Sequence, residues 1–211
     1  MKKIILLKFK KEPFFTKEAL KSYSDNTSGS FSYNIGRWLK TGDVIALKKG
    51  IYTTKEAFEE YSKYEGYREF IASVIRKPSY ISLETVLNKY DMLTEISPIT
   101  TSITNKVGRI YKNGIGIFRY RNIKEGLFCG FETKLFADKY TYYEATKSKA
   151  LFDFLYYRLK LLPIDLANFD VLEEFRINTD SMKRKDWKKF NEYVRTLDDK
   201  RMYNIYKQIC K

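Results

Sequence analysis

Polar side chains suited to binding a nucleic acid gather between residues 30 and 49. Arginine and asparagine form paired hydrogen bonds with guanine and adenine edges, while serine and tyrosine hydroxyls reach phosphates. We expect six of these side chains on exposed arcs of one helix and two lysines in the turn that follows. The candidate DNA-contacting residues are Ser30, Ser32, Tyr33, Asn34, Arg37, Lys40, Lys48 and Lys49.

The distribution of charge favours the same chemistry. The chain of 211 residues has 40 basic and 26 acidic side chains, a formal net charge of +14 that suits a polyanionic partner. The chain is also rich in Lys, Tyr, Ile and Asn, a bias that an AT-rich genome produces whatever the function, so position is more informative than the total. Residues 1–52 contain eleven basic and four acidic side chains, which concentrates half of the excess in about a quarter of the chain.

A second basic run lies near the C-terminus around Trp187. A run of cations with an aromatic residue can bind nucleic acid or an acidic partner, and it can equally be a solvated helix face. Both interpretations stay open at this point. The basic residues are Lys183, Arg184, Lys185, Lys188 and Lys189.

Enzymatic chemistry has little support. The chain contains no histidine, which removes the usual general base near neutral pH and the commonest metal ligand. Cys129 and Cys210 lack the spacing of a zinc site or a disulfide framework. No phosphate-loop motif is present, and Gly29-Ser30 is not followed by the carboxylates that a nucleotidyltransferase needs to hold Mg²⁺. We therefore predict a protein that is not an enzyme and uses no cofactor or metal.

The elements that must position the first cluster are three helices and a hairpin. Thr16 is suited to cap a helix over 17–23, and Gly42 to end a helix that runs from about 28 to 40. Two short strands then surround the basic turn. This order is typical of a winged helix-turn-helix, whose third helix enters the major groove. The expected inward stripe of that helix is Phe31, Ile35, Trp38 and Leu39.

The rest of the chain predicts a mixed sheet with surrounding helices, so the fold class is α+β. Asn113-Gly114 is typical of a tight hairpin turn. We place a winged-helix domain at 1–65 and a larger mixed domain, with a small sheet and C-terminal helices, at 66–211. Helices are expected at 4–7, 55–63, 67–76, 151–162, 166–175, 181–197 and 199–210, and strands at 99–104, 109–112, 115–123, 127–131 and 141–143.

The sequence predicts a soluble, cytoplasmic protein with no membrane partner. The apolar run near the N-terminus ends after four residues, which is too short for an export signal. No other segment approaches the roughly 18 consecutive apolar residues that a membrane span needs.

Several blocks resemble the AbiEi-type antitoxins of bacterial type IV toxin–antitoxin and abortive infection systems. Residues 15–19 (FTKEA), 37–45 (RWLKTGDVI) and 48–52 (KKGIY) are similar to the N-terminal domain of that family. Residues 77–87 (KPSYISLETVL) and 147–153 (KSKALFD) are similar to its second domain. Asp91 departs from the pattern, which has glycine there, although aspartate tolerates the left-handed conformation that ends a helix. The resemblance spans roughly residues 14–160.

The resemblance implies a repressor of its own operon that binds inverted-repeat double-stranded DNA through the winged helix. It also implies a second domain that counteracts a nucleotidyltransferase toxin, with direct contact left open, and a monomer that could bind adjacent repeats cooperatively. We would place toxin antagonism at the C-terminal basic run. The alternative is a nucleic-acid-processing enzyme or accessory nuclease whose second-domain carboxylates bind metal. A neighbouring nucleotidyltransferase reading frame would favour the first function, and metal-dependent cleavage the second.

Overall fold

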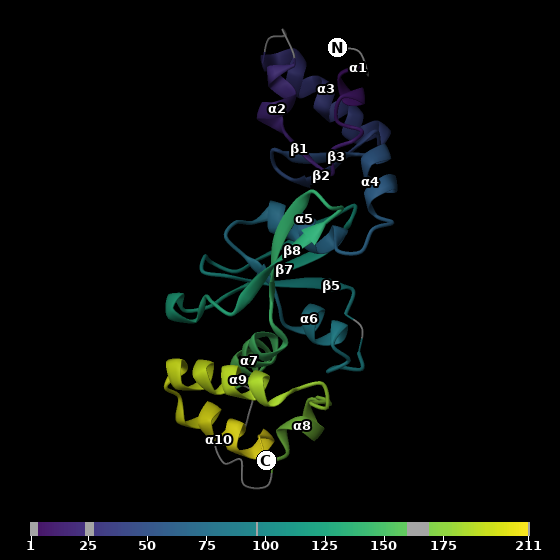
Figure 1. Cartoon of the computed structure of the whole chain (residues 1–211). Helices are drawn as coiled ribbons and strands as arrows, with labels where there is room; N and C mark the ends of the chain where they lie inside the picture. The colour runs from purple at the N-terminus through teal and green to yellow at the C-terminus, as the bar shows by residue number, and fades with distance from the viewer. Residues whose placement is uncertain (1–3, 24–27, 96, 160–168, 211) are drawn as a thin grey trace.

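The chain folds into two sheets surrounded by helices, which confirms the α+β class. A computed structural model describes residues 4–23, 28–95, 97–159 and 169–210. Figure 1 shows the elements following one another along an elongated molecule, from the N-terminal helices through the sheets to the C-terminal helices. No helix in these ranges is long and apolar enough to cross a membrane.

The N-terminal part is built on a small antiparallel sheet with the strand order β1-β3-β2. Figure 1 shows three helices gathered on one side of this sheet. Together they enclose a small hydrophobic cluster of Leu6, Phe9, Phe15, Leu20, Ile35, Trp38, Val44 and Tyr52. The elements are α1 (Ile4–Leu7), β1 (Phe15–Thr16), α2 (Lys17–Ser22), α3 (Ser28–Thr41), β2 (Val44–Lys48) and β3 (Ile51–Thr54).

Two local predictions in this part are confirmed. The Thr16 hydroxyl accepts a hydrogen bond from the Ala19 backbone N–H at 3.1 Å, so Thr16 caps α2 as expected. Gly42 follows α3 with a φ of 74°, a left-handed conformation that glycine adopts without a Cβ penalty. The start of α2 and the end of α3 are therefore encoded locally.

A buried helix joins the small sheet to the rest of the molecule. Helices α4 (Lys55–Tyr61) and α5 (Tyr67–Ile75) correspond to the helices predicted at 55–63 and 67–76, and Gly66, with a φ of 84°, lies between them. Seven of the nine residues of α5 are buried, because this helix contacts β2 on one side and strands of the larger sheet on the other. Helix α5 therefore packs between the small sheet and the larger sheet.

The larger sheet has six strands in the order β6-β7-β5-β4-β9-β8. Its β5–β7 and β4–β9 pairs are parallel and the other pairs are antiparallel, so the expected mixed sheet is confirmed. The tight hairpin predicted at Asn113-Gly114 joins β6 to β7, with Gly114 and Ile115 as its loop residues between the paired Asn113 and Gly116. The strands are β4 (Tyr80–Ile81), β5 (Ile99–Thr104), β6 (Arg109–Asn113), β7 (Gly116–Asn122), β8 (Phe131–Phe136) and β9 (Tyr140–Ala145).

The strand predicted at 127–131 is wrong. Residues Glu125–Leu127 form a short 3₁₀ helix, and the strand begins at Phe131. That strand turns into β9 through Ala137 and Asp138, both with positive φ. The loop has three residues, 137–139, between the paired Phe136 and Tyr140. Positive φ at an alanine is uncommon, so the sequence carries no clear signal for this turn.

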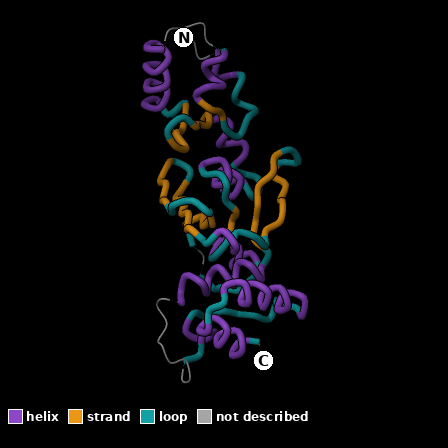
Figure 2. The backbone as a smooth tube through the Cα atoms, turned by 90° about the vertical axis from the view of Figure 1, so that its left-hand side faces the viewer, coloured by secondary structure: helices purple, strands orange, loops and turns teal. Residues whose placement is uncertain are grey.

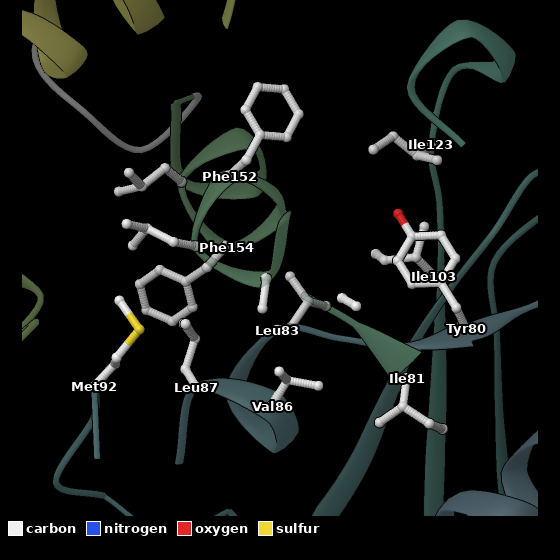
Figure 3. Close-up of a cluster of buried hydrophobic side chains, with 14 of the residues drawn as sticks. Tyr80, Ile81, Leu83, Val86, Leu87, Met92, Ile103, Ile123, Phe152 and Phe154 are labelled. Atoms are coloured by element: carbon white, nitrogen blue, oxygen red, sulfur yellow. The ribbon is translucent and has the colours of Figure 1, made fainter. Parts of the chain in front are cut away.

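Helices cover the larger sheet and close the C-terminal end. Figure 3 shows Leu83 and Leu87 beside Phe154, in the core that α6 and α7 share. Ring contacts of Phe190 with Phe152, at 6.1 Å between centroids, fasten α9 to α7. Figure 2 shows the last helices stacked at the C-terminal end. These helices are α6 (Glu84–Lys89), α7 (Lys147–Arg158), α8 (Val171–Glu174), α9 (Arg184–Leu197) and α10 (Lys200–Ile209).

One prediction in this region lies partly outside the described residues, and another is confirmed. The helix predicted at 166–175 begins only at Val171 among the described residues, with residues 160–168 outside them. Asp91 has a φ of 55° just after α6, so the left-handed helix end expected at this position is confirmed.

Buried tyrosines make the fold sensitive to alkali. Burial raises the pKa of Tyr67 to about 12 and that of Tyr142 to about 12. Because the unfolded chain releases these protons near pH 10, we expect full stability below about pH 10 and a progressive loss as the pH rises towards about 12, up to about 3 kcal/mol per buried tyrosine. Urea unfolding over a pH series, with tyrosinate absorbance recorded in parallel, measures this.

The control for this prediction is Tyr67→Phe, which removes one titrating group. Its loss of stability with alkali should be smaller than that of the unmodified chain. A free energy of unfolding that stays constant through this pH range would contradict the prediction.

Candidate nucleic-acid interface

The outer face of α3 presents cations and a tyrosine to solvent. Ser32, Arg37 and Lys40 are exposed, and Tyr33 is 72% exposed. Helix α3 contains no acidic residue, and neither Arg37 nor Lys40 forms an ion pair with a carboxylate in the described parts of the chain. Helical spacing places Tyr33, Arg37 and Lys40 along one side. We call Ser32, Tyr33, Arg37 and Lys40 the outer face of α3.

Buried residues on the opposite side of α3 set this orientation. Trp38 is 1% exposed and Ile35 is 6% exposed, within the small hydrophobic cluster. A buried tryptophan is costly to withdraw from its packing, so it fixes the rotation of the helix about its own axis. The outer face is therefore held outward by the same core that stabilises the helix.

Two sequence predictions on α3 are wrong. Asn34 is only 5% exposed and does not belong to the outer face, whereas Leu39, expected inside, is 37% exposed. The buried arc is centred on Trp38 and extends towards Asn34, which leaves Leu39 at the opposite margin. The side chains of Ser30 and Phe31 lie outside the described residues.

Lys48 does not have the free position predicted for it. Its ammonium donates a hydrogen bond to the Ile75 carbonyl at 2.5 Å. Ile75 ends α5, and unpaired carbonyls at a helix C-terminus attract cations. Lys48 therefore stabilises the junction with α5, and its predicted place in the turn is wrong, because it pairs with Ile51 at the end of β2. Lys49 is exposed in the turn beside Gly50, whose φ is 85°.

The β2–β3 hairpin is fastened to the larger sheet. The Asn113 amide donates to the Leu47 carbonyl at 2.9 Å, and Leu47 belongs to the larger hydrophobic cluster. Nearby, Tyr140 donates to the Glu12 carboxylate at 2.7 Å. Figure 1 shows the small sheet directly next to the larger one. These contacts set the direction of α3 relative to the rest of the molecule.

The C-terminal basic run forms a separate cationic surface on α9. Lys183, Arg184, Lys185, Lys188 and Lys189 are all exposed. Lys189 pairs with Glu192 at 2.8 Å, and the Trp187 ring packs on Phe190 at 5.9 Å. Trp187 is partly buried and serves the core, so the run is a charged face without a free aromatic platform. Figure 1 places α9 and α3 towards opposite ends of the molecule, so the two basic regions are not brought together.

A buried polar network in the larger domain was not predicted from the sequence. The Lys149 ammonium lies 2.7 Å from one Asp153 carboxylate oxygen, and both side chains have 0% exposure. Tyr80 and Ser82 donate hydrogen bonds to the other oxygen, at 3.0 and 2.7 Å. Burial raises the pKa of the Asp153 carboxyl, whereas Lys149 and the hydroxyls favour its charged form.

This network joins the two blocks 77–87 and 147–153. The Ser82 hydroxyl bonds to Asp153, and the N-terminus of α6 has no side-chain cap. The backbone before α6 carries Leu83 at a φ of 59°, a strained position for a residue with a branched side chain. The signal for this network in the sequence is the spacing of Lys149 and Asp153, four residues apart among the apolar residues of α7.

The described ranges contain no cluster of side chains suited to bind a metal ion. Among these residues, no group of three or more His, Cys, Asp or Glu side chains could hold a metal ion. Cys129 and Cys210 are both free thiols.

Comparison with models of known protein families gives no match to this chain, and comparison with characterised protein sequences also gives none.

Proposed function

We propose that this chain is a DNA-binding regulator and antitoxin, with a winged helix-turn-helix at its N-terminus. The observation that carries the DNA-binding part is the outer face of α3, which is cationic, carries no carboxylate and projects from a small packed core. The helices, the small sheet and the hairpin occur in the order typical of that module. Helix α3 is then the recognition helix.

The physical argument concerns which groups reach which part of the DNA. The major groove is about 12 Å wide and admits one helix, where an arginine can bind guanine through two hydrogen bonds. Arg37 has that role in our proposal, and Lys40 and the Tyr33 hydroxyl bind phosphates. In the hairpin, Lys49 is the residue left for the DNA backbone, because Lys48 bonds to α5.

The antitoxin part of the proposal comes from the resemblance of residues 77–87 and 147–153 to the second domain of AbiEi-type antitoxins. The proposed partner is a nucleotidyltransferase toxin, and the proposed DNA is an inverted repeat upstream of the operon, bound by a monomer that can act cooperatively. Proximity of those two blocks around Asp153 supports the idea that they belong to one functional domain. The chain has no enzymatic role in this proposal.

Replacing Arg37 with alanine tests the DNA-binding part. Loss of one paired contact to a base costs about 1–3 kcal/mol, so affinity for the upstream duplex should fall by roughly 5- to 150-fold. Fluorescence anisotropy with the upstream duplex and with a scrambled duplex, at two salt concentrations, measures both affinity and selectivity. Discrimination between the two duplexes should shrink in Arg37→Ala.

Two variants serve as controls. Lys185→Ala removes an equal charge from α9, and Lys48→Met removes the cation that bonds to Ile75. Both should keep the affinity for the upstream duplex within a few-fold of the unmodified chain. Equal, weak binding of both duplexes, with no effect of Arg37→Ala, would rule out the winged-helix proposal.

A further inference from the structure

A shallow hollow of about 680 Å³ lies on the side of the larger sheet where β6 forms the edge. Its lining includes Arg109, Ile110, Arg119, Arg121 and Tyr157, and it contains no acidic residue. We call these five residues the arginine hollow. It is distinct from the outer face of α3 and from the basic run on α9.

The register of the sheet places an apolar side chain among the arginines. Ile110 of β6 lies opposite Arg119 of β7, so both point to the same face, and Arg121 follows two residues later on that face. Ile110 is 55% exposed, and Val107, just before β6, is 76% exposed. The hollow therefore combines exposed aliphatic surface with guanidinium groups.

These arginines lack an internal counterion. In the described parts of the chain, Arg109, Arg119 and Arg121 form no ion pair with a carboxylate, whereas the neighbouring Arg158 lies 3.3 Å from Glu84. Arginine is the side chain best suited to bind a carboxylate through two parallel hydrogen bonds. Arg109 lies opposite Tyr120 and points to the other face of the sheet, so Arg119 and Arg121 are the two arginines on the Ile110 face. These two groups are complementary to an anionic partner.

The aliphatic surface favours a protein partner over a nucleic acid. Single-stranded nucleic acids bind through bases stacked on aromatic rings. The Tyr157 ring is occupied by the Arg121 guanidinium at 4.8 Å, and its hydroxyl donates to the Asn122 carbonyl. Ile110 and Val107 have no π face to offer. Carboxylates flanking an apolar side chain would match this surface instead.

The position of the hollow at a sheet edge favours a partner segment in an extended conformation. β6 forms one edge of the six-stranded sheet, and an edge strand can align an extended peptide beside it. Alternating residues of such a peptide point to one face, which would bring its side chains beside Ile110. Arg119 and Arg121 extend on the same face from the next strand, β7, and their long side chains can reach across β6.

We infer that the arginine hollow binds an extended segment of a partner protein that carries acidic side chains around an apolar one. This inference rests on the proposed function only in that the second domain acts on a protein. It places the contact at β6 and β7 instead of at the basic run on α9.

The test uses the full chain and a short labelled peptide in which Asp and Glu alternate with Leu and Val. A matched peptide carries Asn and Gln in place of the acids, and labelled oligothymidine represents nucleic acid. Anisotropy titrations compare the unmodified chain with Arg119→Gln/Arg121→Gln and with Ile110→Ser. Lys188→Gln/Lys189→Gln, which removes the same charge from α9, is the matched control.

We expect the acidic peptide to bind, the amide peptide to bind at least about tenfold more weakly, and the paired arginine variant to weaken the acidic peptide by about tenfold or more. Ile110→Ser should weaken it by a few-fold, and the α9 variant should leave it within about twofold. Melting temperatures of all variants verify that each is folded.

Two results would overturn the inference. The first is an acidic peptide that does not bind, or whose binding is insensitive to the arginine pair. The second is oligothymidine binding that depends on the arginine pair, which would make the hollow a nucleic-acid site. Titrations of the same variants with the upstream duplex test the proposed function separately. If replacing the two arginines leaves duplex binding unchanged, DNA recognition stays with α3. If the unmodified chain does not bind the upstream duplex selectively, the proposed function fails and the inference about the arginine hollow does not.

Discussion

Replacing Asp153 with alanine should lower the free energy of unfolding by about 3–5 kcal/mol, because it leaves the Lys149 charge buried without its counterion. The Tyr80 and Ser82 hydroxyls lose their acceptor at the same time. A buried donor without a partner adds its own desolvation cost. Urea unfolding followed by circular dichroism measures the change in free energy.

The matched control removes both charges together. Lys149→Met/Asp153→Leu keeps apolar volume in the core and leaves no buried ion, so it should be clearly more stable than Asp153→Ala alone. The two hydroxyls remain without their acceptor in this variant, so we expect partial recovery. A single Asp153→Ala variant within about 1 kcal/mol of the unmodified chain would show that the ion pair is not buried as described.

Replacing Trp38 with alanine should destabilise the N-terminal part by about 3–5 kcal/mol, the usual cost of deleting a large buried ring. Because Trp38 anchors the side of α3 opposite its outer face, DNA affinity should be lost with it. The larger core is a separate cluster and keeps its own contacts. Trp187 is then the remaining tryptophan, and its fluorescence reports unfolding around α9.

Two measurements test this prediction: amide hydrogen exchange in residues 28–54 reports the stability of the N-terminal part, and the unfolding transition followed by Trp187 fluorescence reports that of the C-terminal part. Trp38→Phe is the milder control: it retains an aromatic ring and removes an indole N–H that has no acceptor among the described residues. Its cost should be below about 2 kcal/mol. Unchanged exchange in Trp38→Ala would contradict the role of Trp38 as the anchor of α3.

Local features of the fold were predictable because their causes lie within a few residues. Thr16 caps α2 through a backbone N–H three residues later, and Gly42 supplies the positive φ that follows α3. In the β6–β7 turn, the Asn113 side-chain oxygen accepts hydrogen bonds from the Ile115 and Gly116 backbone N–H groups. The hairpin through Ala137 and Asp138 escaped prediction, because its two positive φ values occur at residues that do not usually adopt them.

The candidate site was also predictable only where its causes are local. The position of Trp38 and the absence of acidic residues in α3 indicate a cationic outer face from the sequence alone. The neighbours of Asn34 and Lys48 could not be inferred in this way. Burial of Asn34 depends on how α3 packs in its cluster, and the partner of Lys48 is a carbonyl 27 residues away.

By itself, then, the sequence determined the α+β class, the order of helices and hairpin at the N-terminus, and a cationic α3, because periodicity, capping and turn chemistry act over short separations. Only the tertiary structure decided that Asp153 meets Tyr80 and Ser82, more than 70 residues away. It also decided that Arg119 and Arg121 lie on the same face as an exposed Ile110, without an ion pair to a carboxylate among the described residues. Charge compensation and burial depend on which distant segments pack together, and no local pattern encodes that.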